Sequence, residues 1–280
     1  MTISAEALEE EIAGLSESAW HALYLAHARG ERRDILPFPD AQTQRVTNNR
    51  QGEANALDAI DILSCMLRGA GEAGALRRDM QVLDYGCGWG RMTRLLPFYF
   101  RSGNISGVDV DARLIDSARK LLPFLCHEVI TSMQALSFAD DRFDLILANS
   151  VFSHLSERCC VFSLGELARV LKPGGVLVIS VLHAQEIQRL YAKHATQAWI
   201  SGVFGEPDAA LAQLERDGFI WRDTRRRDHY GIAAMTPDWI ERRFAEAGLV
   251  YLATRRRESG DTHSYKVGRK PRDGRLGFDI

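Results

Sequence analysis

The sequence predicts a doubly wound α/β fold with a mostly parallel, seven-stranded sheet, an N-terminal helical extension and an insert after the fifth strand. Between residues 81 and 182, apolar strand-like runs alternate with amphipathic helical segments, which is the pattern of a parallel sheet. The run 176–182 carries no charge, as expected of a strand buried on both faces. A turn with three glycines follows the first strand-like run, at the edge where open α/β sheets bind their ligands.

Residues 1–70 are expected to form the helical extension. Apolar residues at helical spacing predict helix over residues 4–30, with an interruption at 14–16, and a further helix from about 53 to 67. The proline-containing segment 36–40 separates the two. Two roles are open for this extension: a lid over a bound ligand, or a surface for dimerisation.

The core is expected at residues 71–183, and the rest of the chain completes the sheet. Strands are predicted near 81–85, 104–108, 126–131, 143–148 and 176–182, with helices near 90–99, around 114–121 and over 157–171. The alternation lapses in the insert, residues 184–235, which has helical stretches near 184–195 and 206–216. Residues 236–280 are expected to supply a helix near 237–247 and closing strands near 249–256 and 263–268.

Composition and charge narrow the class of protein. The chain has 280 residues, of which 46% are hydrophobic, enough for a substantial core. Its formal net charge of −2 gives no general reason to expect a nucleic acid or an anionic membrane as partner. The five cysteines form no CxxC pair, so we expect reduced thiols and no bound metal. No apolar run approaches the ~20 residues of a membrane span, and the acidic N-terminus lacks an apolar signal segment. We therefore expect a cytoplasmic protein.

The glycine turn, Gly86-Cys87-Gly88-Trp89-Gly90, is the most informative stretch of the chain. Glycine accepts a positive φ and lets a ligand approach the backbone closely. A strand, glycine turn and helix together present backbone N–H groups to that ligand. The third glycine, Gly90, comes one place earlier than in the dinucleotide fingerprint. Arg91 occupies the position at which that fingerprint has its third glycine. This spacing speaks against a nicotinamide-dependent oxidoreductase, an alternative that a titration with nicotinamide dinucleotide tests.

Four successive segments resemble the motifs of the class I S-adenosylmethionine-dependent methyltransferases: VLDYGCGWGR, ISGVDVD, FDLILANSVFSHL and ELARVLKPGGVLVIS. The strings GCGWGR and SVFxHL are similar to those of bacterial members that act on small molecules. The resemblance implies a Rossmann-like core, S-adenosylmethionine as cofactor with S-adenosylhomocysteine as product, and a small-molecule acceptor, with oxygen ahead of nitrogen as the methylated atom. A homodimer is compatible with it. The alternatives are a cofactor-binding protein without catalysis and a methyltransferase acting on protein or RNA.

The resemblance also implies a set of cofactor contacts. Asp84 is expected to orient the amino group of the cofactor, and Asp109 to accept hydrogen bonds from both ribose hydroxyls. The alternative for Asp109 is to cap the helix that follows it. The family usually has an acid near the end of the third strand, where this chain departs from the pattern. The expected contacts are Asp84, Gly86, Cys87, Gly88, Arg91, Asp109, Val110, Ser132, Met133 and Asn149.

Two histidines are candidates for a general base. His154 follows the fourth strand and His183 the fifth, near the ligand-binding edge of the sheet, and neutral imidazole accepts a proton near pH 7. His154 is the first choice, and the alternative for both is a structural hydrogen bond. In the insert, His229, Tyr230 and Arg227 are expected to line the acceptor pocket, although the arginine cluster around Arg227 also suits a solvated loop.

Overall fold

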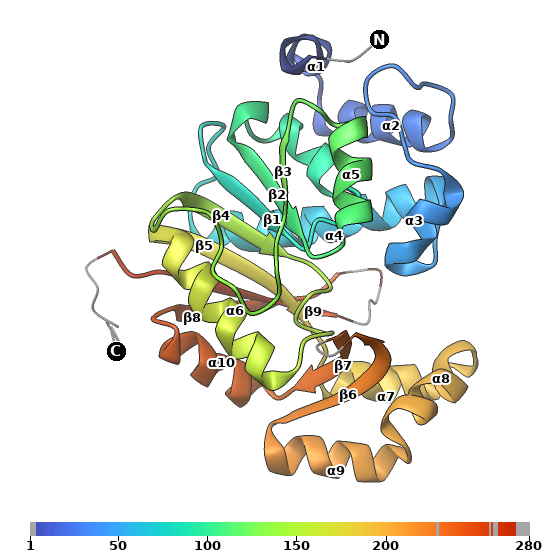
Figure 1. Ribbon diagram of the computed structural model, residues 1–280, viewed down its shortest axis with the longest axis vertical. Helices are drawn as coiled ribbons and strands as arrows, with labels where there is room; N and C mark the ends of the chain where they lie inside the picture. Colours follow the sequence, from blue (N-terminus) through green and yellow to red (C-terminus); the bar gives the residue numbers. More distant parts are fainter. Residues whose placement is uncertain (1–3, 228–229, 258, 260–262, 273–280) are drawn as a thin grey trace. The chain divides into compact units, whose positions relative to one another are not determined.

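The computed structural model describes residues 4–227, 230–257, 259 and 263–272, and it contains a seven-stranded sheet and a separate two-stranded sheet (Figure 1). The strand order of the large sheet is β3-β2-β1-β4-β5-β9-β8. The pairs β1–β2, β2–β3 and β4–β5 are parallel, whereas β9 runs antiparallel to both β5 and β8. This confirms the predicted α/β fold with a mostly parallel sheet.

The chain divides into two compact units. One contains the described residues up to Leu67 and Ala75–Thr131, and the other contains Arg68–Gly74 and the described residues from Ser132 onwards. The expected boundaries at residues 70, 183 and 235 stay predictions. No helix among the described residues is long and apolar enough to span a membrane.

The first unit combines the N-terminal helices with the first three strands. The predicted interruption is confirmed, because the first two helices are separated by a turn in which Gly14 has a φ of +77°. The short third helix was not predicted, because its sequence AQTQRVTN is polar; the Asp40 carboxylate caps it. The elements are α1 (Ala5–Ile12), α2 (Glu17–Ala28), α3 (Ala41–Asn48), most of α4 (Gly52–Ala73), β1 (Val82–Tyr85), β2 (Ile105–Asp109), α5 (Ala112–Leu121) and β3 (Cys126–Val129).

The α-helix predicted at 90–99 is wrong in type. The glycine turn leads into a 3₁₀ helix, η1 (Thr93–Phe98), and a second one, η2 (Ser102–Asn104), precedes β2. Pro97 lies inside η1, and proline has no N–H to continue an α-helical ladder. Helix α2 packs on this segment: the Trp20 indole donates to the Leu95 carbonyl (3.2 Å), and the Tyr24 hydroxyl to the Arg91 carbonyl (2.8 Å). Both rings are fully buried, so the extension and the turn region share one core.

The second unit contains the remaining strands of the large sheet. Helices α6 and α10 lie side by side against them, and α7, α8 and α9 gather beside β6 and β7 (Figure 1). Helix α6 ends at Val170, one residue before the predicted end, and β5 begins at Leu171, five residues before the predicted strand. The elements are β4 (Phe143–Ala148), α6 (Glu157–Val170), β5 (Leu171–Val181), α7 (Ala184–Ala192), α8 (His194–Phe204), α9 (Pro207–Asp217), β6 (Phe219–Arg227), β7 (Tyr230–Met235), α10 (Pro237–Glu246), β8 (Val250–Arg255) and β9 (Ser264–Arg269).

The insert after β5 has a small core of its own. Leu190, Ile200 and Leu214, one from each helix, are buried against Ile220 and Ile232 of the two strands. Helix α8 and the β6–β7 hairpin were not predicted, because the hairpin strand FIWRDTRRR resembles a basic loop more than a strand. Since the insert buries its own apolar residues, it is a packed substructure within the second unit.

Candidate functional site

The glycine turn has the backbone conformation that the sequence predicts. Gly86, Gly88 and Gly90 have φ values of +80°, +55° and +81°, which residues with a side chain rarely adopt. The N–H groups of Gly86 and Cys87 donate to the Val108 carbonyl at 2.8 and 3.0 Å, so the turn is tied to the end of β2. A Cβ at Gly90 would also lie 2.9 Å from the Leu122 side chain. Glycine is therefore needed at Gly90 for both conformation and space.

Asp109 ends β2 and faces this turn. Its Oδ2 accepts a hydrogen bond from the Gly88 N–H (2.8 Å), and its Oδ1 accepts one from the Asp111 N–H (2.8 Å). Each carboxylate oxygen can accept a further hydrogen bond. The cap of α5 is Asp111, which accepts from the Arg113 N–H, so Asp109 is not the helix cap. Burial raises the pKa of Asp109, and Val110 beside it is exposed.

Asp84 is a buried carboxylate that the described residues satisfy only in part. Its side chain lies at the end of β1 and the residue is 1% exposed. Its Oδ2 accepts from the Thr93 hydroxyl (2.6 Å), but no described residue donates to Oδ1. Burial raises the pKa of Asp84 to about 6. A buried acceptor without a donor costs free energy, so its position beside the turn suits a ligand that brings a donor.

Two arginines hold the turn within the first unit. Arg91, an expected cofactor contact, directs Nη1 to Asp58 (2.9 Å) and Asn55 (3.3 Å) of α4. Arg94, which is not among the expected contacts, is fully buried, and its guanidinium lies over the rings of Trp89 and Phe38 at 4.7 and 4.8 Å.

The Arg94 guanidinium also donates hydrogen bonds to backbone carbonyl groups, two of the turn and one of the segment before α3. It donates to Gly90 (2.9 Å), Trp89 (3.2 Å) and Pro37 (2.8 Å). Burial lowers the pKa of Arg94 to about 10, which leaves it protonated at neutral pH. No feature of the sequence distinguished it from a surface arginine on the expected α-helix.

In the second unit, the residues expected to contact the cofactor lie at turns after strands. Ser132 and Met133 begin the segment that connects to β4, and Met133 has a φ of +61°. Asn149 directly follows β4, and Ser150 beside it has a φ of +56°. The Ser150 N–H donates to the Ser180 hydroxyl of β5 (2.6 Å), which fixes this turn. Positive φ values at non-glycine residues are costly and often occur at ligand sites.

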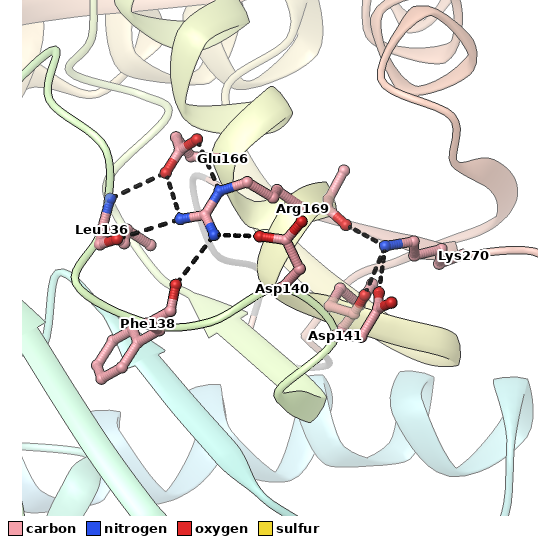
Figure 2. Close-up of polar contacts among 9 residues, drawn as sticks. Leu136, Phe138, Asp140, Asp141, Glu166, Arg169 and Lys270 are labelled. Atoms are coloured by element: carbon pink, nitrogen blue, oxygen red, sulfur yellow. Dashed lines mark hydrogen bonds and ion pairs between the residues drawn. The ribbon is translucent and has the colours of Figure 1, made fainter.

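Arg169 of α6 anchors the segment that leads from Met133 to β4 (Figure 2). Its guanidinium donates to the carbonyls of Phe138 (2.9 Å) and Leu136 (3.1 Å) and to the carboxylate of Asp140 (2.6 Å). Glu166 accepts from Arg169 and from the Leu136 N–H (2.9 Å). In the same region, Lys270 binds Asp141 and two carbonyl groups. These bonds fix the segment within the second unit.

His154 is held in one tautomer. Its Nδ1 lies 2.8 Å from the Gly231 carbonyl, which only accepts, so Nδ1 carries the proton in the neutral ring. Its Nε2 then has the lone pair and lies 3.3 Å from the Ser150 hydroxyl. The ring stacks on Tyr230, with centroids 4.6 Å apart. The structure thus brings His154 and Tyr230 together, while His229 and the Arg227 side chain lie outside the described residues.

His183 is a different kind of histidine. It precedes α7 and is buried, its Nδ1 donates to the Met235 carbonyl, and its N–H donates to Glu186 (3.0 Å). Burial, followed by the nearby Lys266 charge, lowers its pKa to about 4, so the ring is neutral at pH 7. His154 and His183 bond to opposite ends of β7, at Gly231 and Met235, so the two histidines do not form a pair.

Comparisons with known proteins agree with this geometry. Residues 82–175 match the family model described as a methyltransferase domain. The 2-methyl-6-phytyl-1,4-hydroquinone methyltransferase of Synechocystis is 32% identical, over 58% of this chain and 52% of the relative. The malonyl-[acyl-carrier protein] O-methyltransferase of Enterobacter lignolyticus is 33% identical, over 44% and 45%. The chain thus spans about half the length of these curated relatives.

A solved structure supports the fold. The crystal structure of an S-adenosylmethionine-dependent methyltransferase from Mesorhizobium loti superposes with a TM-score of 0.56. The match covers 76% of this chain and 100% of the other, at 16% identity.

Proposed function

We propose that this chain, which carries a methyltransferase domain of the class I S-adenosylmethionine-dependent type, transfers a methyl group to an oxygen atom of a small-molecule acceptor. The observation that carries the proposal is the pair of acids at the glycine turn, Asp84 and Asp109, together with the orphaned oxygen of Asp84. Oxygen is favoured because the similar relative from Enterobacter lignolyticus is named an O-methyltransferase.

The residues at the turn fit the cofactor. Asp109 has free acceptor capacity for two ribose hydroxyls, and Asp84 Oδ1 can accept from the amino group or from a water bound to it. Gly86 and Gly88 leave the backbone open to close approach. When bound, S-adenosylmethionine supplies a methyl group on a positively charged sulfur. We include Cys87, Arg91, Val110, Ser132, Met133 and Asn149 in the proposed contacts.

His154 is the proposed general base for a hydroxyl acceptor. Because the Gly231 carbonyl holds the Nδ1 proton, the Nε2 lone pair is the atom that would receive a proton. The Ser150 hydroxyl is within reach to donate to this nitrogen in the neutral ring and to accept from it once the nitrogen is protonated. Tyr230, His229 and Arg227 complete the proposed acceptor pocket. A carboxylate acceptor loses no proton and needs no such base.

The N-terminal helices and the insert are proposed to exclude water from the reaction, as a lid. The alternative role of the N-terminal helices is to form the interface of a homodimer. Light scattering of the free chain tests this role, because it measures whether the chain has the mass of a monomer or of a dimer. We further propose a cytoplasmic location, because all five cysteines are free thiols, the state that a reducing compartment maintains.

The test is methyl transfer from labelled S-adenosylmethionine to separate panels of hydroxyl, carboxylate, amine, protein and RNA acceptors. Label in a hydroxyl or carboxylate compound supports the proposal. Label only in an amine, protein or RNA overturns it, and cofactor binding without transfer to any panel favours the binding protein without catalysis.

The role of His154 is tested on the hydroxyl acceptor that this assay finds. His154→Ala should lower kcat by ~10²–10⁴ and leave cofactor affinity nearly unchanged, because general-base catalysis is lost. His21→Ala, on α2, is the control and should turn over like the parent. A His154→Ala variant that folds and keeps the parental rate would assign this histidine a structural role.

A further inference from the structure

A cavity of about 510 Å³ in the second unit combines polar groups that the proposed methyl transfer does not use. It lies where α10, β8 and β9 meet the end of β5, and all its lining residues belong to this unit. The lining consists of His183, Pro237, Glu241, Tyr251, Thr254, Arg255, Arg256 and Lys266.

Lys266 is an uncommon residue for the middle of a strand. It is 2% exposed, and its Nζ donates to the Thr254 hydroxyl (2.6 Å) and lies 5.5 Å from the centre of the Tyr251 ring. None of the described carboxylates forms an ion pair with Nζ, although the charges of Glu241 and Glu186 act on it without direct contact. Two of its three N–H donors therefore remain for a ligand, and burial lowers the pKa of this lysine.

Glu186 forms no ion pair with Lys266, and its carboxylate bonds to other groups. It is fully buried and accepts from the Ser264 hydroxyl (3.0 Å) and the His183 N–H (3.0 Å). Its charge is offset by Arg256, 3.6 Å away. Arg255, also at the cavity, pairs with Glu72 of α4. Lys266 is thus a buried cation of the cavity with no directly paired carboxylate among the described residues.

His183 adds an acceptor to the same cavity. The residue is 5% exposed, and because Nδ1 donates to the Met235 carbonyl, Nε2 carries the lone pair. No described residue donates to Nε2. A buried acceptor of this kind is costly unless a donor reaches it. The exposed Glu241 carboxylate at the cavity likewise favours a donor or a cation.

We propose that this cavity is a binding site for a small carboxylate that also carries a hydrogen-bond donor, a hydroxyl or an ammonium group. The carboxylate binds Lys266, with Arg256 at the side, and the donor group meets His183 Nε2 and Glu241. The requirement for both groups follows from the two unsatisfied partners, one a donor and one an acceptor. The site is inferred for binding alone and does not depend on the proposed methyl acceptor.

Three four-carbon acids that differ in one substituent test the proposal by calorimetry on the full chain: succinate, L-malate and L-aspartate. Malate or aspartate should bind at least 10-fold more tightly than succinate, because only they carry the donor. A preference for malate identifies the donor as a hydroxyl, and a preference for aspartate identifies it as an ammonium group. Equal affinity for all three acids would overturn the proposal. So would the absence of saturable binding of any acid up to roughly 10 mM, because a weaker dissociation constant corresponds to a binding free energy of only a few kcal/mol.

Lys266→Met should lower the affinity for the preferred acid at least 10-fold, and the exposed Lys120→Met on α5 should leave it unchanged. A folded Lys266→Met variant that binds like the parent excludes this lysine and overturns the site. If Lys266→Met does not fold, the selectivity of the parent chain still decides. The calorimetry measures binding of the acids and does not measure methyl transfer. A failure of this site is therefore distinguishable from a failure of the proposed methyl transfer.

Discussion

At the scale of single residues, the glycine turn joins groups that are unfavourable by themselves. Asp84 is buried with one oxygen unsatisfied, and three glycines within five residues have a positive φ. Such features lower the stability of the free chain and are retained where a ligand repays them. The acids were identifiable from their positions after apolar strand-like runs. Arg94 was not, since its burial depends on Phe38 and Trp89 enclosing it from two parts of the chain.

Asp84→Asn should stabilise the free chain at neutral pH. The pKa of Asp84 is about 6 in the folded chain and about 3.9 in an unfolded chain, so the folded state holds its proton more tightly. Ionisation of this carboxylate therefore lowers the free energy of unfolding as the pH rises from about 4 to 6. The loss is on the order of 3 kcal/mol at pH 7. Urea unfolding of parent and variant at pH 7 and pH 4 measures it.

The stability gain of Asp84→Asn should shrink towards zero at pH 4, and the variant should bind the cofactor more weakly. A variant that is less stable than the parent at pH 7, by the same amount as at pH 4, would contradict a buried, ionised Asp84.

At the scale of elements, regular patterns were predicted and context-dependent ones were not. The strands of the core and helices α2, α5, α6 and α10 have continuous periodicity, which depends on each element alone. The 3₁₀ helix after the turn was missed, because Pro97 and the carbonyl bonds of Arg94 override an apparently helical pattern. The hairpin β6–β7 was missed because the arginines at the end of β6 resemble a basic loop, and the register of the pair is interrupted between Asp223 and Arg227.

Helix α2 stabilises the turn region through side-chain bonds to its carbonyls. Tyr24→Phe removes the hydroxyl that donates to Arg91, a fully buried bond, and should lower the free energy of unfolding by about 1–2 kcal/mol. Urea unfolding measures this loss. Tyr99→Phe is the matched control, because its hydroxyl bonds to the exposed Glu17 and its loss should be smaller. Equal losses in the two variants would mean that the bond to the turn has no special weight.

The segment between β3 and β4 should depend on Arg169. Arg169→Met removes the donors to Leu136 and Phe138, so amide exchange over residues 134–142 should become at least about 5-fold faster, the change expected from about 1 kcal/mol of lost local stability. Arg243→Met on α10 is the control, as its bonds go to Glu157 and Glu246 at the surface. Unchanged exchange over this segment in Arg169→Met would show that other contacts hold it.

At the scale of the whole molecule, the two compact units carry separate parts of the proposed function. The first unit contains the glycine turn with Asp84 and Asp109, and the second contains His154 and the insert. The cavity beside Lys266, which the proposed methyl transfer does not use, also lies in the second unit. The fold and the conformation of the glycine turn could be predicted from local motifs in chain order. The cavity could not, because its residues are separated by up to 83 positions, from His183 to Lys266, and only the strand order unites them.

Calorimetric titration of the full chain with S-adenosylhomocysteine tests the cofactor site most directly. We expect saturable binding to the parent and a loss of about 1–3 kcal/mol in Asp109→Ala, because hydrogen-bonding groups lose their partner. Asp111→Ala should keep the parental affinity, because it removes the cap of α5 and the pair with Arg113 but leaves the Asp109 carboxylate in place. Nicotinamide dinucleotide should not bind. Unchanged affinity in a folded Asp109→Ala variant, or tighter binding of the dinucleotide, would contradict a cofactor site at this turn.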